Sequence, residues 1–476
     1  TDLCEGVTCE VDENECTGDG VCDPADGACD YVPVEDGTFC GTDGVCEAGA
    51  CKERSWGAPD FLPGAFQAAA FDASGRALVV YTKATDFTCW SHPNPDVEVP
   101  YTETVSCIWG TRFVRDIGWE TATELQCEVP SCGSSGWSRF FRINVASSSN
   151  GSGFASWGVG TYDEYYSEAT QFTTSSGWGS SSRLFSQFYL GDSLGPGLAV
   201  DASGDAIAAT QVRDQIVAKR YVESVGWGEE EVIGQVGQRE SLYLNAVDVV
   251  LGQSGDGVAY WNSTTFGPTT NRYTSGDGWG DPTRIVDVNG WGVMEIGVDG
   301  DGNMMASLAQ SDGTSWSLWS SQWTPAEGWT EPELIAQDAL LSFRRAYWDM
   351  AMNPRGDAVI VWLNSDGTDY SLWSSRYTPG EGWAEPELIG ARTSPIAEPM
   401  VGIDDQGNST AMWREADEGT QSLWSSRWTP KDGWREAELV SAENGSSFAL
   451  GVEPNGDATA VWTGVDSSGM WANRFE

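Results

Sequence analysis

A tryptophan recurs eight times in one local pattern, and this recurrence constrains the fold of the chain more than any other feature. Seven copies follow a glycine, and an aromatic residue preceded by Arg or Gln lies six positions before each of these seven. The tryptophans are Trp56, Trp119, Trp178, Trp227, Trp279, Trp329, Trp383 and Trp434, and the aromatics are Phe113, Phe172, Tyr221, Tyr273, Trp323, Tyr377 and Trp428. A constant spacing over periods of roughly fifty residues is typical of a repeat architecture.

The eighth copy of the pattern is divided between the two ends of the chain. Arg474-Phe475 is an eighth Arg-aromatic pair, and its tryptophan, Trp56, lies at the other end in a segment that reads like residues 382–389. A repeat completed by both termini is what a closed ring of sheets requires, because closure removes the exposed sheet edges.

Each repeat fits a four-stranded antiparallel blade, as the sixth repeat illustrates. We expect strands over residues 348–352, 358–362, 371–377 and 383–389, separated by turns rich in Gly, Pro, Asn and Asp. No long stretch has the apolar spacing of a helix. The sequence therefore predicts an all-β fold: an eight-bladed β-propeller over residues 54–476, whose last blade is closed by N- and C-terminal strands.

The charge balance limits the partners of the chain. There are 71 acidic and 25 basic residues, for a formal net charge of −46. Such a chain is not expected to bind nucleic acid or anionic lipid surfaces. No apolar stretch is long enough to span a membrane, so no membrane insertion is expected either. The acidic surface keeps a secreted protein soluble, or alternatively concentrates divalent cations.

The N-terminal segment is a predicted disulfide-rich module over residues 1–53. An even number of cysteines in a short segment with few apolar residues indicates a disulfide scaffold, whose connectivity the sequence leaves open. A zinc site fits less well, because the segment contains no His. The cysteines are Cys4, Cys9, Cys16, Cys22, Cys29, Cys40, Cys46 and Cys51.

Four further cysteines lie in the predicted ring. Cys89 and Cys107 bracket an insertion in the first blade, and Cys127 and Cys132 bracket the loop to the second blade. We expect these two pairs to be disulfide-bonded, although the two loops share a face and a swapped pairing stays open. Disulfides indicate an oxidising compartment, so the protein is expected outside the cell or at its surface, with a signal peptide removed.

Two parts of the sequence resemble known families. The spacing of Cys16 to Cys51 is similar to the cysteine-rich modules that precede larger domains on secreted or surface proteins of social and predatory bacteria. Asp12 to Cys16 resembles the opening of calcium-binding EGF-like modules. The Trp-rich repeats resemble tectonin-like and fucose-binding lectins, and this resemblance implies carbohydrate binding at several equivalent sites.

Within the repeats, Trp319, Trp373 and Trp424 are the candidates for stacking on sugar rings. The alternative is that they pack between blades, and their repetition favours this interpretation.

Departures from the repeat point to a separate ligand site. The insertion of the first blade carries Trp90 and His92, the single His of the chain, and is either a ligand-binding loop or a disulfide-bonded cover. The loop before the sixth blade carries Arg344, Arg345, Tyr347 and Trp348. Its two arginines suit a carboxylate or sulfate, or else an ion pair with a neighbouring acidic loop.

One turn has the oxygen ligands of a calcium site. Asp299, Asp301 and Asn303 alternate with glycines, but the distal Glu of an EF-hand loop is missing. The same positions form ordinary turns in other repeats, so a plain turn is the alternative.

Three functions remain from the sequence. The first is a secreted, non-enzymatic protein that binds carbohydrate or another surface ligand, with calcium as the expected ion. The second is an adhesive subunit of a surface assembly that self-associates or binds a surface protein through the N-terminal module. The third is a glycan or peptide hydrolase, for which no nucleophile motif is present.

Overall fold

The computed structural model consists of antiparallel β-sheets, and the residues that it describes contain no α-helix. It describes residues 21–22, 28–30, 39–40, 44–47, 50–53, 55–94, 97–115, 117–128, 138–161, 164–186, 195–236, 247–252, 254–263, 266–286, 291–311, 315–339, 347–365, 368–392, 394–417, 420–442, 447–464 and 469–476. Over these ranges, no helix has the length and apolarity needed to cross a membrane.

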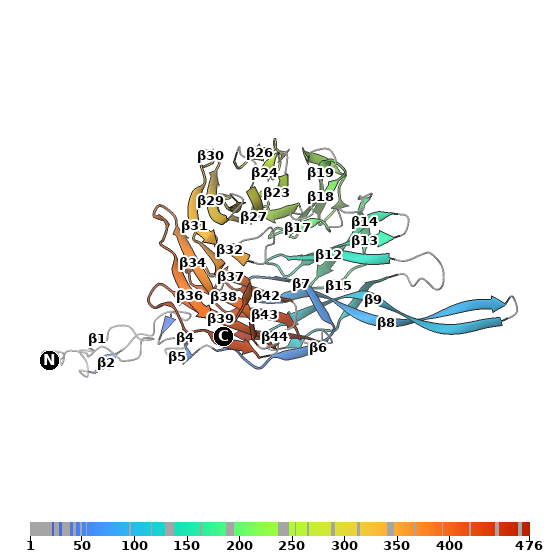
Figure 1. The fold of residues 1–476 in the computed structure, drawn as a ribbon, viewed down its shortest axis with the longest axis horizontal. Helices are drawn as coiled ribbons and strands as arrows, with labels where there is room; N and C mark the ends of the chain where they lie inside the picture. Colours follow the sequence, from blue (N-terminus) through green and yellow to red (C-terminus); the bar gives the residue numbers. More distant parts are fainter. Residues whose placement is uncertain are drawn as a thin grey trace. The chain divides into compact units, whose positions relative to one another are not determined.

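The chain divides into two compact units, residues 1–59 with 473–476 and residues 60–472. The first unit contains two small sheets: β1 (Val21–Cys22) with β2 (Cys29–Asp30), and β3 (Phe39–Cys40) with β4 (Gly44–Glu47) and β5 (Ala50–Glu53). The second unit contains the eight blades of a β-propeller, which confirms the fold predicted from the repeats (Figure 1).

Blades 1 to 7 share one topology. Three strands pair in chain order, and the outermost strand is divided into two short pieces that both pair with the third strand. Blade 1 is β7 (Ala65–Phe71), β8 (Ala77–Asn94), β9 (Val97–Val114), β10 (Gly118–Trp119) and β11 (Thr123–Cys127). Blade 2 is β12 (Ser138–Ser147), β13 (Gly153–Thr161), β14 (Tyr165–Thr173), β15 (Gly177–Trp178) and β16 (Ser182–Ser186). Blade 3 is β17 (Gly197–Val200), β18 (Ala206–Val212), β19 (Gln215–Val222), β20 (Gly226–Trp227) and β21 (Glu231–Gln235).

The remaining blades of this type follow the same order. Blade 4 is β22 (Asp248–Leu251), β23 (Gly257–Ser263), β24 (Gly267–Thr274), β25 (Gly278–Trp279) and β26 (Thr283–Arg284). Blade 5 is β27 (Trp291–Val298), β28 (Met304–Ser311), β29 (Trp316–Thr324), β30 (Gly328–Trp329) and β31 (Glu333–Ala339). Blade 6 is β32 (Trp348–Met352), β33 (Ala358–Ser365), β34 (Tyr370–Thr378), β35 (Gly382–Trp383) and β36 (Glu387–Arg392). Blade 7 is β37 (Ile396–Ile403), β38 (Ser409–Asp417), β39 (Thr420–Thr429), β40 (Gly433–Trp434) and β41 (Glu438–Ser441).

The divided outer strand differs from the single strand expected over residues 383–389. In blade 6 the backbone leaves the ladder between β35 and β36, and the same break occurs in blades that have no proline there, such as blade 7. A bulge between Leu372 and Trp373 lies further along the ladder, where these residues pair with Gly390 and Leu388 of β36. The other three expected strands of this blade are confirmed, each extended by no more than a few residues at its ends.

The eighth blade is closed by the N-terminal segment, as the divided repeat predicts. Its sheet has the order β42 (Phe448–Val452), β43 (Ala458–Thr463), β44 (Gly469–Phe475) and β6 (Asp60–Pro63). Within the first unit, Trp56 forms a bridge with Phe475, and the two rings are 5.8 Å apart at their centroids. The split motif is therefore reassembled from the two ends of the chain.

The core of the propeller lies between adjacent blades. Several of the largest fully buried side chains are tryptophans of the second strands, including Trp157, Trp261, Trp413 and Trp462. The hydrophobic clusters join residues of neighbouring blades, such as Ile335 of blade 5 with Trp362 of blade 6. Because each blade buries its faces against its neighbours, the repeated apolar positions are needed in every blade.

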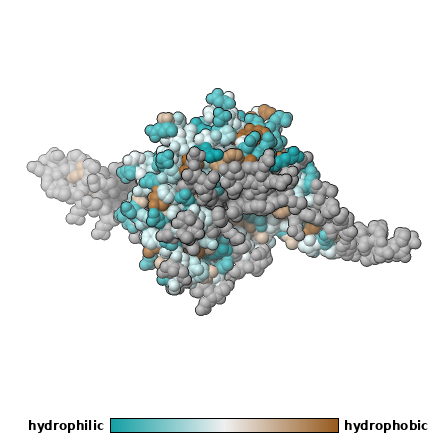
Figure 2. All heavy atoms as spheres, turned by 45° about the horizontal axis from the view of Figure 1, so that its top comes forward, coloured by the Kyte–Doolittle hydropathy of each residue, from teal (hydrophilic) through white to brown (hydrophobic). Residues whose placement is uncertain are grey.

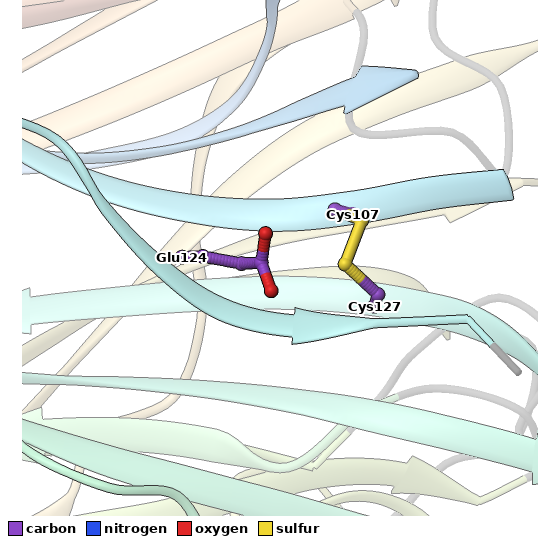
Figure 3. A group of neighbouring side chains, drawn as sticks. All are labelled: Cys107, Glu124 and Cys127. Carbon is purple, nitrogen blue, oxygen red and sulfur yellow. A yellow bond between two sulfur atoms is a disulfide. The ribbon is translucent and has the colours of Figure 1, made fainter. Parts of the chain in front are cut away.

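The expected disulfide pairing in the ring is wrong. Cys107 is bonded to Cys127, 20 residues further along the chain (Figure 3). The predicted insertion of blade 1 is a continuation of β8 and β9 as one long hairpin, in which Lys83 lies opposite Cys107 and Cys89 lies opposite Tyr101 (Figure 1). Cys89 is therefore out of reach of Cys107, whereas Cys127 of β11 is the cross-strand partner of Cys107. Cys132 and three of the N-terminal cysteines, Cys4, Cys9 and Cys16, lie outside the described residues.

Candidate functional site: two grooves between blades

The Arg of the repeated motif contacts the aromatic residue of the next blade. In four of the repeats the guanidinium lies over the ring, at distances from 3.6 to 5.5 Å between the guanidinium carbon and the ring centroid. The pairs are Arg112 with Phe172, Arg220 with Tyr273, Arg272 with Trp323, and Arg376 with Trp428. This is the geometry of a cation–π contact, and it explains why Arg precedes an aromatic in so many repeats.

Where Gln replaces Arg, the next blade carries Tyr. The Tyr221 hydroxyl donates to Gln171 Oε1 at 2.9 Å, and the Tyr377 hydroxyl donates to Gln322 Oε1 at the same distance. The motif therefore connects adjacent blades by one of two contacts, and we call this connection the inter-blade lock. In one form an Arg guanidinium lies over an aromatic ring, and in the other a Gln side chain accepts a hydrogen bond from a Tyr hydroxyl.

The tryptophan of the Gly-Trp pair completes this lock. In most repeats its ring packs against the aromatic of its own blade, as Trp383 does against Tyr377 at 5.7 Å between centroids. Its indole N–H reaches the preceding blade: Trp383 Nε1 donates to Ser320 Oγ at 2.6 Å, and Trp434 Nε1 to Ser374 Oγ at 2.7 Å. The repeated tryptophans therefore hold the ring together.

Trp319, Trp373 and Trp424 take part in packing between blades. Each is partly buried against a cluster that includes an aliphatic residue of the preceding blade, for example Trp373 with Ile335. The Nε1 atoms of Trp373 and Trp424 donate to Ser371 and Ser422 of their own strands at 2.9 Å. These contacts support the packing interpretation of the three residues.

A groove of about 300 Å³ lies between blades 6 and 7, and is called here the 6–7 groove. Its lining combines an aromatic ring, a cation and three carboxylates: Trp428, Arg376, Glu381, Glu385 and Glu387, with Trp383, Ser374, Ser375, Thr378, Gly382 and Ala384. The glutamates come from the turn and outer strand of blade 6, and all three are exposed.

Hydrogen bonds hold the polar groups of the 6–7 groove in place. Trp428 Nε1 donates to Glu387 Oε2 at 3.1 Å. Arg376 donates to Ser409 Oγ at 2.7 Å and to the carbonyl of Gly407, both in blade 7. Burial lowers the pKa of the Arg376 guanidinium to about 10, a shift that the carboxylates of Asp357, Glu387 and Asp404 oppose. Arg376 is therefore still a cation at neutral pH.

A second groove of about 500 Å³ lies between blades 3 and 4, and is called here the 3–4 pocket. Val232 and Ile233 of β21 form one wall, and Trp261, Thr269 and Asn271 of blade 4 form the other. Phe266 and Arg284 also line it, with the guanidinium 5.5 Å from the centre of the phenyl ring. Neither groove was predicted from the sequence.

The predicted loop site is placed only in part. The backbone of Trp90 and His92 lies in β8, but their side chains are outside the description, as are Arg344 and Arg345 altogether. Tyr347 is half-buried between blades 6 and 7. Trp348 is 3% exposed and its Nε1 donates to Ser307 Oγ at 3.4 Å, so its ring is placed for packing and not for stacking on a ligand.

The predicted calcium turn is held by its own hydrogen bonds. Asp299 Oδ1 accepts from the backbone N–H groups of Asp301 and Asn303 at 2.9 and 2.8 Å, and Asp299 Oδ2 accepts from Asn303 Nδ2 at 2.8 Å. Asp404 makes the same set of contacts with Gln406 and Asn408 in blade 7. The arrangement is that of a repeated turn, and calcium binding there stays a prediction.

Among the described residues, one group of potential metal ligands lies close together: Cys107, Glu124 and Cys127 (Figure 3). The two sulfurs are bonded to each other, and a disulfide offers no thiolate to a metal. This group is therefore a structural crosslink.

No family model matches the chain, and no curated protein is significantly similar to it in sequence. Among solved structures, the BP39L lectin from Burkholderia pseudomallei superposes with a TM-score of 0.50 and 11% identity, covering 80% of this chain and all of the lectin. A PL25 ulvan lyase (TM-score 0.45, 9% identity, 76% and 94% covered) and the fucose-specific lectin of Aleuria aurantia (0.35, 14%, 63% and 96%) are also similar. At these identities the comparisons show the fold alone: the chain is a β-propeller.

Proposed function

We propose that the protein is a non-enzymatic carbohydrate-binding protein that acts outside the cell, with a ligand site in the 6–7 groove. The observation that carries this proposal is the meeting of an aromatic ring, an arginine and three carboxylates in one groove of about 300 Å³. A concave site with apolar and aromatic walls and a few fixed polar groups is the usual form of a small-ligand site.

The groove suits the chemistry of a sugar ring. The C–H groups of a pyranose pack on an aromatic surface, which Trp428 and Trp383 provide. Sugar hydroxyls donate hydrogen bonds to carboxylates, and their oxygens accept from guanidinium groups. Glu381, Glu385 and Glu387 are the acceptors, and Arg376 is the donor.

The charge of the protein favours neutral over acidic glycans. Its formal net charge is −46, and the groove itself carries three carboxylates beside one guanidinium. Hydrophilic residues cover most of the described surface on the face that Figure 2 draws, and apolar residues form scattered patches. An anionic polysaccharide is repelled by such a field, whereas a neutral glycan is not. Calcium, if it takes part, binds with the glycan at these carboxylates.

An extracellular location is part of the proposal. The disulfide between Cys107 and Cys127, with the cysteine-rich segment before the ring, fits an oxidising compartment. The strongly acidic surface fits a soluble protein that meets its ligand in solution or on another surface.

A screen of neutral and acidic glycans, run with and without calcium, tests the proposal on the intact protein, on Trp428→Ala and on Trp323→Ala. Trp323 is the matched control, because it holds the same repeat position in blade 5 under Arg272. We expect saturable binding of a neutral glycan to the intact protein and to Trp323→Ala, with loss of binding in Trp428→Ala. Absence of binding to the intact protein under both conditions contradicts carbohydrate recognition. Binding that survives in Trp428→Ala but is lost in Arg344→Ala/Arg345→Ala moves the site to the loop.

A further inference from the structure

The 3–4 pocket lies where most other blades carry a tryptophan. Four positions before the repeat aromatic, five of the eight blades have Trp. These are Trp109, Trp319, Trp373, Trp424 and Trp471. Blade 4 has Thr269 at this position. Side chains on this face of the third strand point toward the preceding blade, as the hydrogen bond from Asn271 Nδ2 to the carbonyl of Ile233 demonstrates.

Strand register makes the comparison direct. Trp362 pairs with Trp373 in blade 6 and Trp413 pairs with Trp424 in blade 7, so two indoles stand side by side on the face toward the preceding blade. In blade 4 the corresponding pair is Trp261 with Thr269. The first indole is kept and the second is absent.

Among the described residues, the position of the absent indole borders an open pocket. Trp373 of blade 6 packs against the cluster that contains Ile335 of blade 5. The residues that correspond in blades 4 and 3, Thr269 and Ile233, line the 3–4 pocket of about 500 Å³. Blades 2 and 3 also lack the tryptophan, but there Glu168 accepts a hydrogen bond from Ser181 at 2.6 Å and Val217 is buried.

The wall of the pocket holds an unused hydrogen-bond acceptor. Asn271 is 2% exposed, and its Nδ2 donates to the carbonyls of Ile233 and Gly280 at 2.7 and 3.0 Å. Its Oδ1 has no partner among the described residues. A buried acceptor without a partner is costly and uncommon. The indole N–H of Trp261 also lacks a described partner, but so do those of Trp413 and Trp462, which makes that feature part of the repeat.

We propose that the 3–4 pocket binds a neutral aromatic ring with an N–H or O–H on its edge, of which indole is the simplest case. The ring takes the place of the missing tryptophan, beside Trp261 and against Ile233, with its polar edge toward the Asn271 side. A neutral ligand fits better than an anionic one, because the protein as a whole is strongly acidic. The same chemistry is offered by a free aromatic metabolite or by an exposed Trp or Tyr of a partner protein. This site is separate from the 6–7 groove, and the proposal does not depend on carbohydrate binding.

The test is a calorimetric titration of indole into the intact protein, Thr269→Trp and Thr269→Val. Indole is expected to bind the intact protein saturably, with a dissociation constant on the order of 1 mM or tighter for so small a ligand. Thr269→Trp supplies the side chain that five other blades carry, so it should weaken indole binding at least ~tenfold while the thermal unfolding temperature is kept or raised. Thr269→Val keeps the pocket open and should bind as the intact protein does.

A second variant keeps the test valid if Thr269→Trp does not fold. Thr269→Leu fills part of the pocket, and it should weaken indole binding by an intermediate factor. No saturable binding of indole to the intact protein overturns the proposal, as does undiminished binding to a folded Thr269→Trp. Titration of N-acetyltryptophan amide beside indole distinguishes a free aromatic metabolite from a Trp side chain of a partner protein. A pocket for partner side chains should bind the amide at least as tightly as indole. Thr269→Trp should keep any glycan binding, so failure here is distinguishable from failure of the carbohydrate proposal.

Discussion

The guanidinium of Arg376 in blade 6 lies 3.6 Å from the ring centroid of Trp428 in blade 7. The same arginine donates to Ser409 Oγ at 2.7 Å and to the carbonyl of Gly407, so one side chain connects two blades through its face and its edge. This contact is both an inter-blade lock and one wall of the 6–7 groove. Architecture and the proposed ligand site therefore share residues.

Removal of this guanidinium should destabilise the ring. Arg376→Ala leaves the Gly407 carbonyl without its donor and uncovers the Trp428 ring, and we expect a loss of about 2–4 kcal/mol in the free energy of unfolding. Arg355→Ala is the control, because its salt bridge to Asp357 is on the surface and should contribute less than ~1 kcal/mol. Urea unfolding followed by tryptophan fluorescence measures both. Equal effects of the two substitutions contradict a locking role for Arg376.

The Gln–Tyr form of the inter-blade lock should contribute less to stability than the Arg form, and it can be tested separately. Tyr377→Phe deletes the hydroxyl that donates to Gln322 Oε1 at 2.9 Å, and should cost about 1 kcal/mol of stability. Tyr273→Phe should cost less, because Arg220 contacts the ring of Tyr273, which Phe preserves. The same unfolding measurement compares the two variants, and a larger loss in Tyr273→Phe argues against the two-form lock.

Asp404 should give the stability of the protein a defined pH dependence. Burial raises the pKa of its carboxyl above the ordinary value of 3.8, against the opposing hydrogen bonds from Gln406 and Asn408. The folded state then holds the proton more tightly than the unfolded state, so this group lowers stability as the pH rises from about 4 through its raised pKa. Asp404→Asn removes that component, and Asn353 already occupies the equivalent turn in blade 6. Relative to the intact protein, the variant should gain stability between pH 4 and neutral pH; a constant difference across that range contradicts the assignment.

The disulfide assignment is tested by peptide mapping. A non-reducing digest should contain a peptide that links Cys107 to Cys127, and none that links Cys107 to Cys89. Replacing both Cys107 and Cys127 by Ser should lower the free energy of unfolding by about 3 kcal/mol, as expected for a loop of this length. A linked Cys89–Cys107 peptide contradicts the register of β8 and β9.

The ring and its closure could be predicted because the repeat places equivalent residues at fixed intervals. The partition of the outer strand could not, because the short break between β35 and β36 depends on backbone pairing that the pattern does not report. The pairing of Cys107 failed for a related reason: β8 and β9 continue beyond the repeat, and the position opposite Cys107 follows from hairpin register.

The two grooves were missed although part of their signal is in the sequence. Thr269 stands where Trp109, Trp319, Trp373, Trp424 and Trp471 stand in other repeats, and a comparison position by position reveals it as one of three exceptions, with Glu168 and Val217. The 6–7 groove gives no such signal, since Arg376 and Trp428 follow the repeat. Its volume arises from how blades 6 and 7 meet, which only the structure describes.

The most direct test of carbohydrate binding is the stoichiometry of the best neutral glycan from the screen, measured by calorimetric titration into the intact protein, Trp428→Ala and Trp323→Ala. A site in the 6–7 groove predicts one glycan per chain, lost in Trp428→Ala and kept in Trp323→Ala. The contrary result is several equivalent glycans per chain, with each variant losing no more than one of them. It would contradict a single site in the 6–7 groove and would indicate that equivalent sites in the repeats bind the glycan.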